Sequence, residues 1–138
     1  MKKILITTVV AMVLFFTCFY GYDYYNGPKI KDGVISKNID SNGKPINMST
    51  EFSPTDTVYF TAKGNRFWVK KAQVVWYKGD IAIENRLFVE DDVKINKEGY
   101  YVTKLSLPEG LEEGRYSVTI FADGNDVRET YAEFYIKK

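Results

Sequence analysis

The chain has 138 residues, of which 19 are basic and 18 are acidic, and it contains no histidine and one cysteine. The absence of histidine excludes imidazole-based catalytic triads and the zinc or copper sites that depend on imidazole ligands. One domain of about 105–110 residues is the most that the chain can form, because its first twenty or so residues differ sharply in composition from the rest.

An uncharged segment of 19 residues, ILITTVVAMVLFFTCFYGY, lies between Lys3 and Asp23. As a helix that rises about 1.5 Å per residue it would cover roughly 28 Å, which is enough to cross the hydrocarbon core of a bilayer. Lys2 and Lys3 precede the segment and an acidic residue follows it, which predicts a cytoplasmic N-terminus and an extracytoplasmic domain. Residues 1–22 are therefore predicted to be a signal or membrane-anchor helix.

Three fates are open for this helix: an uncut anchor, a lipoprotein signal, or a signal that is cleaved to free the domain. Nothing between Thr17 and Asp23 supplies the A-x-A pair of small residues that secretory peptidases require. The stretch Phe15-Phe16-Thr17-Cys18 resembles the bacterial lipoprotein signal, whose cysteine becomes lipidated, although its two phenylalanines and threonine depart from the usual Leu-Ala/Ser-Gly/Ala pattern. Cys18 is thus expected to be membrane-embedded or lipidated.

The rest of the chain is predicted to comprise a stalk at residues 23–32 and a domain at residues 33–138. Without Lys2 and Lys3, the 19 basic residues fall to 17 against 18 acidic ones, a formal charge of −1, which offers nucleic acid no electrostatic footprint. The stalk follows from Asn26-Gly27-Pro28, a turn signal without sustained periodicity. Neighbouring tyrosines such as Tyr24 and Tyr25 are expected at the level of the lipid headgroups.

Alternation of apolar and polar residues in the domain predicts short strands that are separated by turns such as Asn42-Gly43 and Gly79-Asp80. The segments expected to form strands are residues 33–39, 52–63, 70–80, 81–90, 100–107, 115–121 and 127–138. The side chains that alternate onto one face of these strands are Val58, Phe60, Ala62, Ala72, Val74, Trp76, Tyr101, Thr103, Leu105, Leu107, Tyr116, Val118, Ile120, Ala132, Phe134 and Ile136. No helical stripe is present, so an all-β sandwich is predicted.

Five patterns follow one another between about residues 33 and 136: F-x-P-x-D, W-Y, L-P-x-G, G-x-Y-x-V and F-x-I. Their order resembles immunoglobulin-like modules of bacterial surface and exported proteins, which implies one antiparallel sandwich of about seven strands. The resemblance implies that the Tyr116 hydroxyl forms a hydrogen bond with the backbone of the turn before its strand, called the corner below. It also implies that Trp76 is the tryptophan at the centre of the core. The resemblance implies no catalytic residue.

The sequence contains only weak candidates for a catalytic site or a metal site. The adjacent acids Asp91-Asp92 and Glu112-Glu113 are expected to be solvated, because a glycosidase needs two carboxyl groups on opposite sides of a cleft. The segment 122–126, A-D-G-N-D, fits either a calcium loop or a hairpin turn, and the turn is favoured. We therefore predict no catalytic residue, no metal site and no cofactor.

Exposed aromatic residues remain as the functional signal, because 22 of 138 residues are Phe, Trp or Tyr and one core cannot hide all of them. The first candidate patch consists of Arg66, Phe67, Trp68 and Lys70, and the second of Tyr131 and Tyr135. The basic residues around Phe67 and Trp68 suit either a binding patch or contact with anionic lipid headgroups. Capping of the core and protection of an edge strand would also explain the first patch, and packing across the sheet face would explain the second.

The sequence thus predicts a non-enzymatic interaction module on the outer side of a bacterial cytoplasmic membrane. Its expected partner is a protein of the cell envelope. A carbohydrate- or cell-wall-binding domain is the alternative, because sandwiches can lay sugars across exposed Trp and Tyr rings.

Overall fold

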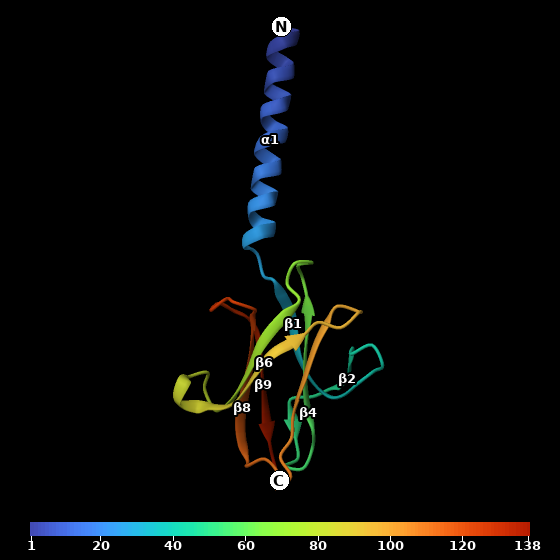
Figure 1. Cartoon of the computed structure of the whole chain (residues 1–138), viewed down its shortest axis with the longest axis vertical. Helices are drawn as coiled ribbons and strands as arrows, with labels where there is room; N and C mark the ends of the chain where they lie inside the picture. The colour runs from blue at the N-terminus through green and yellow to red at the C-terminus, as the bar shows by residue number, and fades with distance from the viewer.

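The computed structural model describes residues 1–138, apart from the side chains of Asp23 and Asn26. It consists of one long helix, α1 (Lys2–Asn26), followed by a β-domain that begins at Ile30. The helix projects away from the domain, so that the two termini lie at opposite ends of the molecule (Figure 1). The stretch Lys2–Tyr22 is long and apolar enough to cross a membrane and is not buried by the domain, which is compatible with a membrane anchor or a signal sequence.

The described residues form nine strands and one short 3-10 helix. These elements are β1 (Ile30–Ile39), β2 (Pro45–Met48), β3 (Glu51–Phe52), β4 (Val58–Gly64), β5 (Lys71–Lys78), η1 (Ile83–Asn85), β6 (Arg86–Lys94), β7 (Tyr100–Leu105), β8 (Gly114–Ala122) and β9 (Arg128–Ile136). The sequence predicted about seven strands; seven of the nine have six or more residues, and the additional β2 and β3 are shorter.

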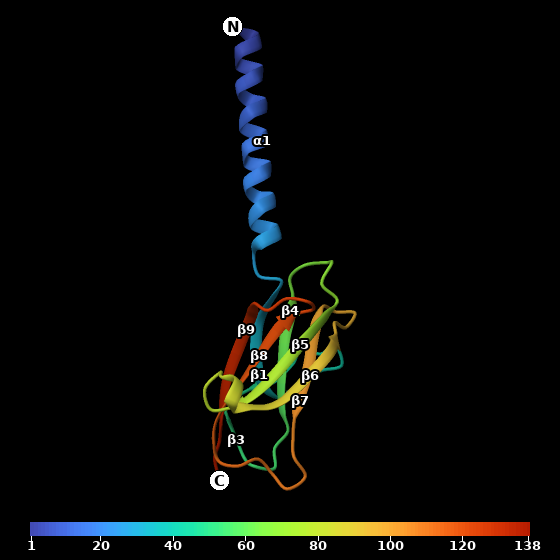
Figure 2. The same cartoon turned by 60° about the vertical axis from the view of Figure 1, so that its left-hand side comes forward.

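The strands form two sheets, which pack face to face (Figure 2). One sheet has the order β2-β1-β4-β7, and the other has the order β3-β9-β8-β5-β6. All neighbouring strands are antiparallel except β3, which pairs in parallel with β9. Lys137, directly after β9, forms an ion pair with Glu51 of β3 in which its ammonium group donates a 2.7 Å hydrogen bond to the carboxylate. This contact links the ends of the two parallel strands.

The core lies between the two sheets because alternate side chains of each strand point inward. Trp76 is fully buried at its centre, with its ring 6.3 Å from that of Phe60 in the opposite sheet and 6.0 Å from that of Phe134. The side chains that were predicted to point inward are buried or partly buried, with the exception of Leu107. Leu107 is exposed, because β7 ends at Leu105 and the chain has already turned away from the core.

The outer face of β5 is buried as well, which the sequence did not predict. Val75 and Tyr77 alternate with the core residues of this strand, yet they are shielded from solvent together with Ser117 and Thr119 of β8. β5 and β8 are interior strands of the larger sheet, flanked by β6 and β9. Both faces of the sheet therefore contain buried side chains at its centre.

The corner before β8 has the geometry that the sequence predicted for Tyr116. The Tyr116 hydroxyl donates a hydrogen bond of 2.7 Å to the backbone carbonyl of Glu112, four residues earlier. Its ring stacks on that of Phe134, with centroids 5.3 Å apart and an interplanar angle of 11°. The predicted turn at Asn42-Gly43 is also present, where Gly43 has a positive φ of 87° that favours glycine.

The helix occupies part of the segment that the sequence assigned to a stalk. α1 continues through Asn26 and β1 starts at Ile30, so only residues 27–29 connect the two elements. The end of the helix is packed against the β4–β5 loop, since the Trp68 ring lies beside those of Tyr24 and Tyr25. The helix and the domain are therefore joined by side-chain contacts in addition to the short connection.

Candidate functional site

The first predicted patch lies in the loop between β4 and β5, at the end of the domain that faces the helix (Figure 2). Phe67 is 74% exposed, and its ring lies edge to face with that of Trp68 at 5.2 Å. Trp68 contacts the helix end, 5.5 Å from the Tyr24 ring and 6.2 Å from the Tyr25 ring. The patch is therefore continuous with the end of α1.

Arg66 does not share the exposure of its neighbours and is 91% shielded, with only 9% of its surface accessible. Its guanidinium carbon lies 4.1 Å from the centroid of the Tyr24 ring, and its Nε donates a hydrogen bond to the Tyr24 carbonyl. A second bond of 2.7 Å runs from Arg66 to the carbonyl of Asn65. Arg66 thus holds the helix end to the loop, whereas Phe67, Trp68 and Lys70 remain at the surface.

The second predicted patch lies on the outward-facing side of β9. Tyr131 and Tyr135 are exposed and flank Glu133, as expected for side chains two residues apart in a strand. The Arg128 guanidinium lies 4.9 Å from the centroid of the Tyr131 ring, so one face of that ring is already covered. Glu133 lies 4.0 Å from Arg115 of β8. The two patches come from different elements, the β4–β5 loop and β9.

A third surface, which sequence reasoning missed, is the β6 edge, defined here as Leu87, Phe88 and Val89. These three consecutive apolar residues are all exposed, and Phe88 has 49% of its surface accessible. Among the described strands β6 pairs only with β5, so its other side has no strand partner. The available signal was the run Leu-Phe-Val, which breaks the alternation of a half-buried strand.

Phe88 borders an open groove of about 600 Å³ beside β7. The residues that line the groove are Ile39, Tyr59, Phe88, Glu90, Val102, Thr103 and Lys104. The Thr103 hydroxyl donates a hydrogen bond to the Glu90 carboxylate and so links β7 to β6 across the open side of the two sheets. Four of the seven lining residues are therefore apolar or aromatic, and the Thr103–Glu90 hydrogen bond lies at one side of the groove.

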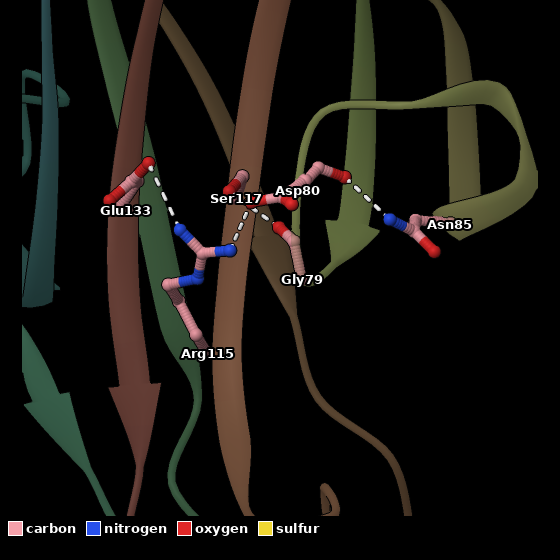
Figure 3. A network of polar contacts seen from close by, with 6 residues as sticks. All are labelled: Gly79, Asp80, Asn85, Arg115, Ser117 and Glu133. Carbon is pink, nitrogen blue, oxygen red and sulfur yellow. Dashed lines mark hydrogen bonds and ion pairs between the residues drawn. The ribbon is translucent and has the colours of Figure 1, made fainter.

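A polar network fixes the connection that leads into β6 (Figure 3). Arg115 forms an ion pair with Asp80, and the Ser117 hydroxyl donates a 2.9 Å hydrogen bond to the Gly79 carbonyl. The Asn85 side chain donates a 3.0 Å bond to the Asp80 carbonyl. The hydrogen bond with Asp80 raises the pKa of Arg115 further above its ordinary value. The connection between β5 and β6, residues 79–85, is thus held to β8 by the side chains of Arg115 and Ser117.

The C-terminal part of β6 departs from regular pairing. Asp91 and Asp92 form a bulge, because the register with β5 shifts between the pairs Val74–Glu90 and Ala72–Val93. Asp92 has a φ of 58°, in the left-handed region. A bulge bends a strand and increases its twist. A second register shift lies between the pairs Trp76–Phe88 and Tyr77–Arg86, at Leu87, so the regular pairing of β6 with β5 covers only Phe88 to Glu90.

Two of the three predicted acidic segments, Asp91-Asp92 and 122–126, lie at the same end of the domain. The third, Glu112-Glu113, lies apart from them, with Glu112 in an ion pair with Lys78. Asp91 and Asp92 line an open pocket of about 490 Å³ together with Asp123 and Asp126 of the β8–β9 loop. Among the residues that the structure describes, no group of three His, Cys, Asp or Glu side chains could hold a metal ion. The segment 122–126 forms the hairpin turn, in which the Asn125 amide donates a 3.0 Å bond to the Ala122 carbonyl.

Comparison with known proteins gives no family for this chain. No protein-family model matches the sequence, and no curated protein matches it either. The functional assignment therefore rests on the geometry of the three surfaces.

Proposed function

We propose that this chain is a non-enzymatic, membrane-anchored interaction module that binds a protein partner outside the cytoplasm, in a bacterial cell envelope. The observation that carries the proposal is the β6 edge, with three consecutive exposed apolar residues on a strand whose outer side is unpaired. Natural edge strands are usually protected by charges or coverage, so an apolar free edge marks a site for a partner.

We propose strand addition as the mode of binding. An extended segment of the partner would pair its backbone with the free side of β6, and its alternate side chains would lie beside Phe88 and the groove or beside Leu87 and Val89. Arg86 and Glu90 flank the apolar residues, so the segment expected to fit best carries apolar residues between charges of opposite sign.

An immunoglobulin-like architecture is part of this proposal. It is supported by the parallel pairing of β3 with β9, by the Tyr116 hydrogen bond to Glu112 and by the burial of Trp76. Such sandwiches serve many unrelated functions, so the architecture supports the scaffold and the β6 edge supports the function.

The retained anchor is the third part of the proposal. Its support is the span Lys2–Tyr22, in which 19 uncharged residues follow Lys2 and Lys3. The two lysines before the apolar stretch favour an extracytoplasmic domain. Lipidation at Cys18, which is exposed on the helix, would attach the domain to the same membrane by a different chemistry. The mass of the mature chain distinguishes these fates.

The test is site-specific photo-crosslinking of the full-length chain in its native membrane, with the crosslinking amino acid placed at position 88. We expect a discrete protein adduct whose crosslinked site falls in an extended segment of the partner. The double variant Leu87→Lys and Val89→Lys should abolish the adduct, because charges on an edge strand oppose strand addition. Leu107→Lys is the matched control, since Leu107 is 40% exposed and Leu87 is 42% exposed.

Persistence of the adduct in the double variant would contradict binding at the β6 edge. The alternative function is binding of a cell-wall polysaccharide, which the exposed rings of Tyr131 and Tyr135 on the outer side of β9 favour. In that case the full-length chain would co-sediment with purified wall polysaccharide. Tyr131→Ala would weaken this sedimentation, and the double variant would leave it unchanged.

A further inference from the structure

We propose that the tip of the β4–β5 loop docks on the lipid headgroup layer of the membrane that holds α1. The docking surface, called the loop tip below, consists of Phe67 and Trp68. This inference rests on the retained anchor of the proposed function and concerns a surface separate from the β6 edge.

The length of the helix determines the depth at which its end lies. The membrane-spanning stretch Lys2–Tyr22 has 21 residues, which at about 1.5 Å per residue cover roughly the 30 Å of a hydrocarbon core. Tyr24 and Tyr25 follow within about 5 Å of further rise, inside the headgroup layer. Tyrosine and tryptophan are enriched at this level because their rings are apolar and their tips are polar.

The loop tip is held at the same level by direct contact with these tyrosines. The Trp68 ring centroid lies 5.5 Å from that of Tyr24 and 6.2 Å from that of Tyr25. Arg66 fixes the loop to the helix through its bond to the Tyr24 carbonyl. Phe67 stands 5.2 Å from Trp68 and is 74% exposed, so a large apolar ring projects where the headgroups would lie.

A second loop contributes an apolar residue at this end of the domain. Val127, in the connection between β8 and β9, is exposed, and both loops lie on the side that faces the helix (Figures 1 and 2). Val127 and Trp68 line one open pocket of about 590 Å³ together with Tyr25. Apolar groups from two separate loops therefore surround the base of the helix.

The charges around the loop tip are mixed. Lys29, Lys70 and Lys71 line the same pocket as Trp68, together with Asp123, and Asp126 follows in the same loop. Lys71 also lies 4.0 Å from the carboxylate of Asp92. Electrostatic attraction to anionic lipid is thus partly cancelled, and the aromatic rings are the main contact. We expect docking on neutral and on anionic membranes alike.

Docking would give the domain a preferred orientation on the membrane. The contacts of Trp68 and Arg66 with the helix end already restrain the domain relative to α1. A contact of the loop tip with the lipid would restrain it relative to the bilayer. The β6 edge takes no part in this contact. A partner strand could therefore reach it while the loop tip rests on the lipid.

The experiment uses the full-length chain in vesicles of phosphatidylcholine and phosphatidylglycerol, with lipids brominated either near the glycerol backbone or near the chain ends. Trp68 is the reporter, because the chain has two tryptophans and Trp76 is fully buried. We expect shallow bromines to quench emission and deep bromines to have little effect. Trp68→Phe should remove the shallow quenching, because only the Trp76 emission remains.

A matched pair of variants tests the loop tip itself. Phe67→Glu should reduce the shallow quenching of Trp68, because a carboxylate replaces the apolar ring in the headgroup layer. Ile83→Glu should leave it unchanged, since Ile83 has a similar exposure of 77% but lies in η1, away from the loop tip.

Extraction of the vesicles at alkaline pH separates the two ways in which the inference could fail. Release of the chain would overturn the retained anchor and the docking together. Retention of the chain without shallow quenching of Trp68 would overturn docking alone and leave the anchor intact. Protection of Trp68 only in native membranes, with a protein crosslinked to position 67, would show that the loop tip binds a protein instead.

Discussion

Tyr116→Phe tests whether the corner before β8 is held by a single hydrogen bond. The substitution keeps the ring and its stack on Phe134 at 5.3 Å but removes the hydroxyl that donates to the Glu112 carbonyl at 2.7 Å. Tyr116 is only 2% exposed, and burial raises the pKa of its hydroxyl, so the group is protonated and can donate at neutral pH.

The magnitude follows from the kind of bond. A neutral hydrogen bond contributes about 1 kcal/mol net, and the partial loss of a partner for the Glu112 carbonyl brings the expected cost to about 1–2 kcal/mol. For a domain of about 110 residues this corresponds to a fall of roughly 4–8 °C in Tm.

The assay is thermal unfolding of the full-length chain in detergent micelles, followed by near-ultraviolet circular dichroism of the buried aromatic rings. Tyr131→Phe is the control, because it removes a hydroxyl from an exposed residue of the neighbouring strand. A loss for Tyr116→Phe no larger than that of the control would refute the reasoning. The corner would then be held by its other contacts, such as the 2.8 Å bond from the Leu111 amide to the Pro54 carbonyl.

Two further predictions concern the core. Trp76→Ala should lower the free energy of unfolding by about 3–5 kcal/mol, because it removes a fully buried ring, and chemical denaturation that detects a much smaller loss would contradict this. Burial raises the pKa of Tyr101 from 10.0 to about 12. Its contribution to stability is therefore complete below pH 10 and is lost as the pH rises through about 12. Alkaline denaturation should show this loss in the parent and not in Tyr101→Phe, and equal pH dependence of the two would contradict the assignment.

Much of the scaffold could be predicted because its signals are local. Alternation placed Val58, Phe60 and Ala62 on one buried face, and the Asn42-Gly43 pair marked a turn. The resemblance to immunoglobulin-like modules implied a hydrogen bond from Tyr116 to the preceding corner, and the structure contains this bond. Such features depend on residues a few positions apart, so the sequence alone is informative about them.

The candidate surfaces were harder to predict. Arg66, Phe67, Trp68 and Lys70 were grouped by composition, but the burial of Arg66 depends on Tyr24, which lies 42 residues earlier in the chain. The β6 edge was missed because a Leu-Phe-Val run can equally be a fully buried strand. Its exposure depends on which strand occupies the end of the sheet.

The sequence by itself determined the apolar N-terminal helix, the β-rich domain and the inward faces of its strands, since these follow from hydrophobic pattern and turn chemistry along the chain. The tertiary structure decided the order of the strands, the parallel pairing of β3 with β9, the free edge at β6 and the contact of Trp68 with the end of α1. These features join residues far apart in the sequence, and only the packing of the two sheets and the helix end brings them together.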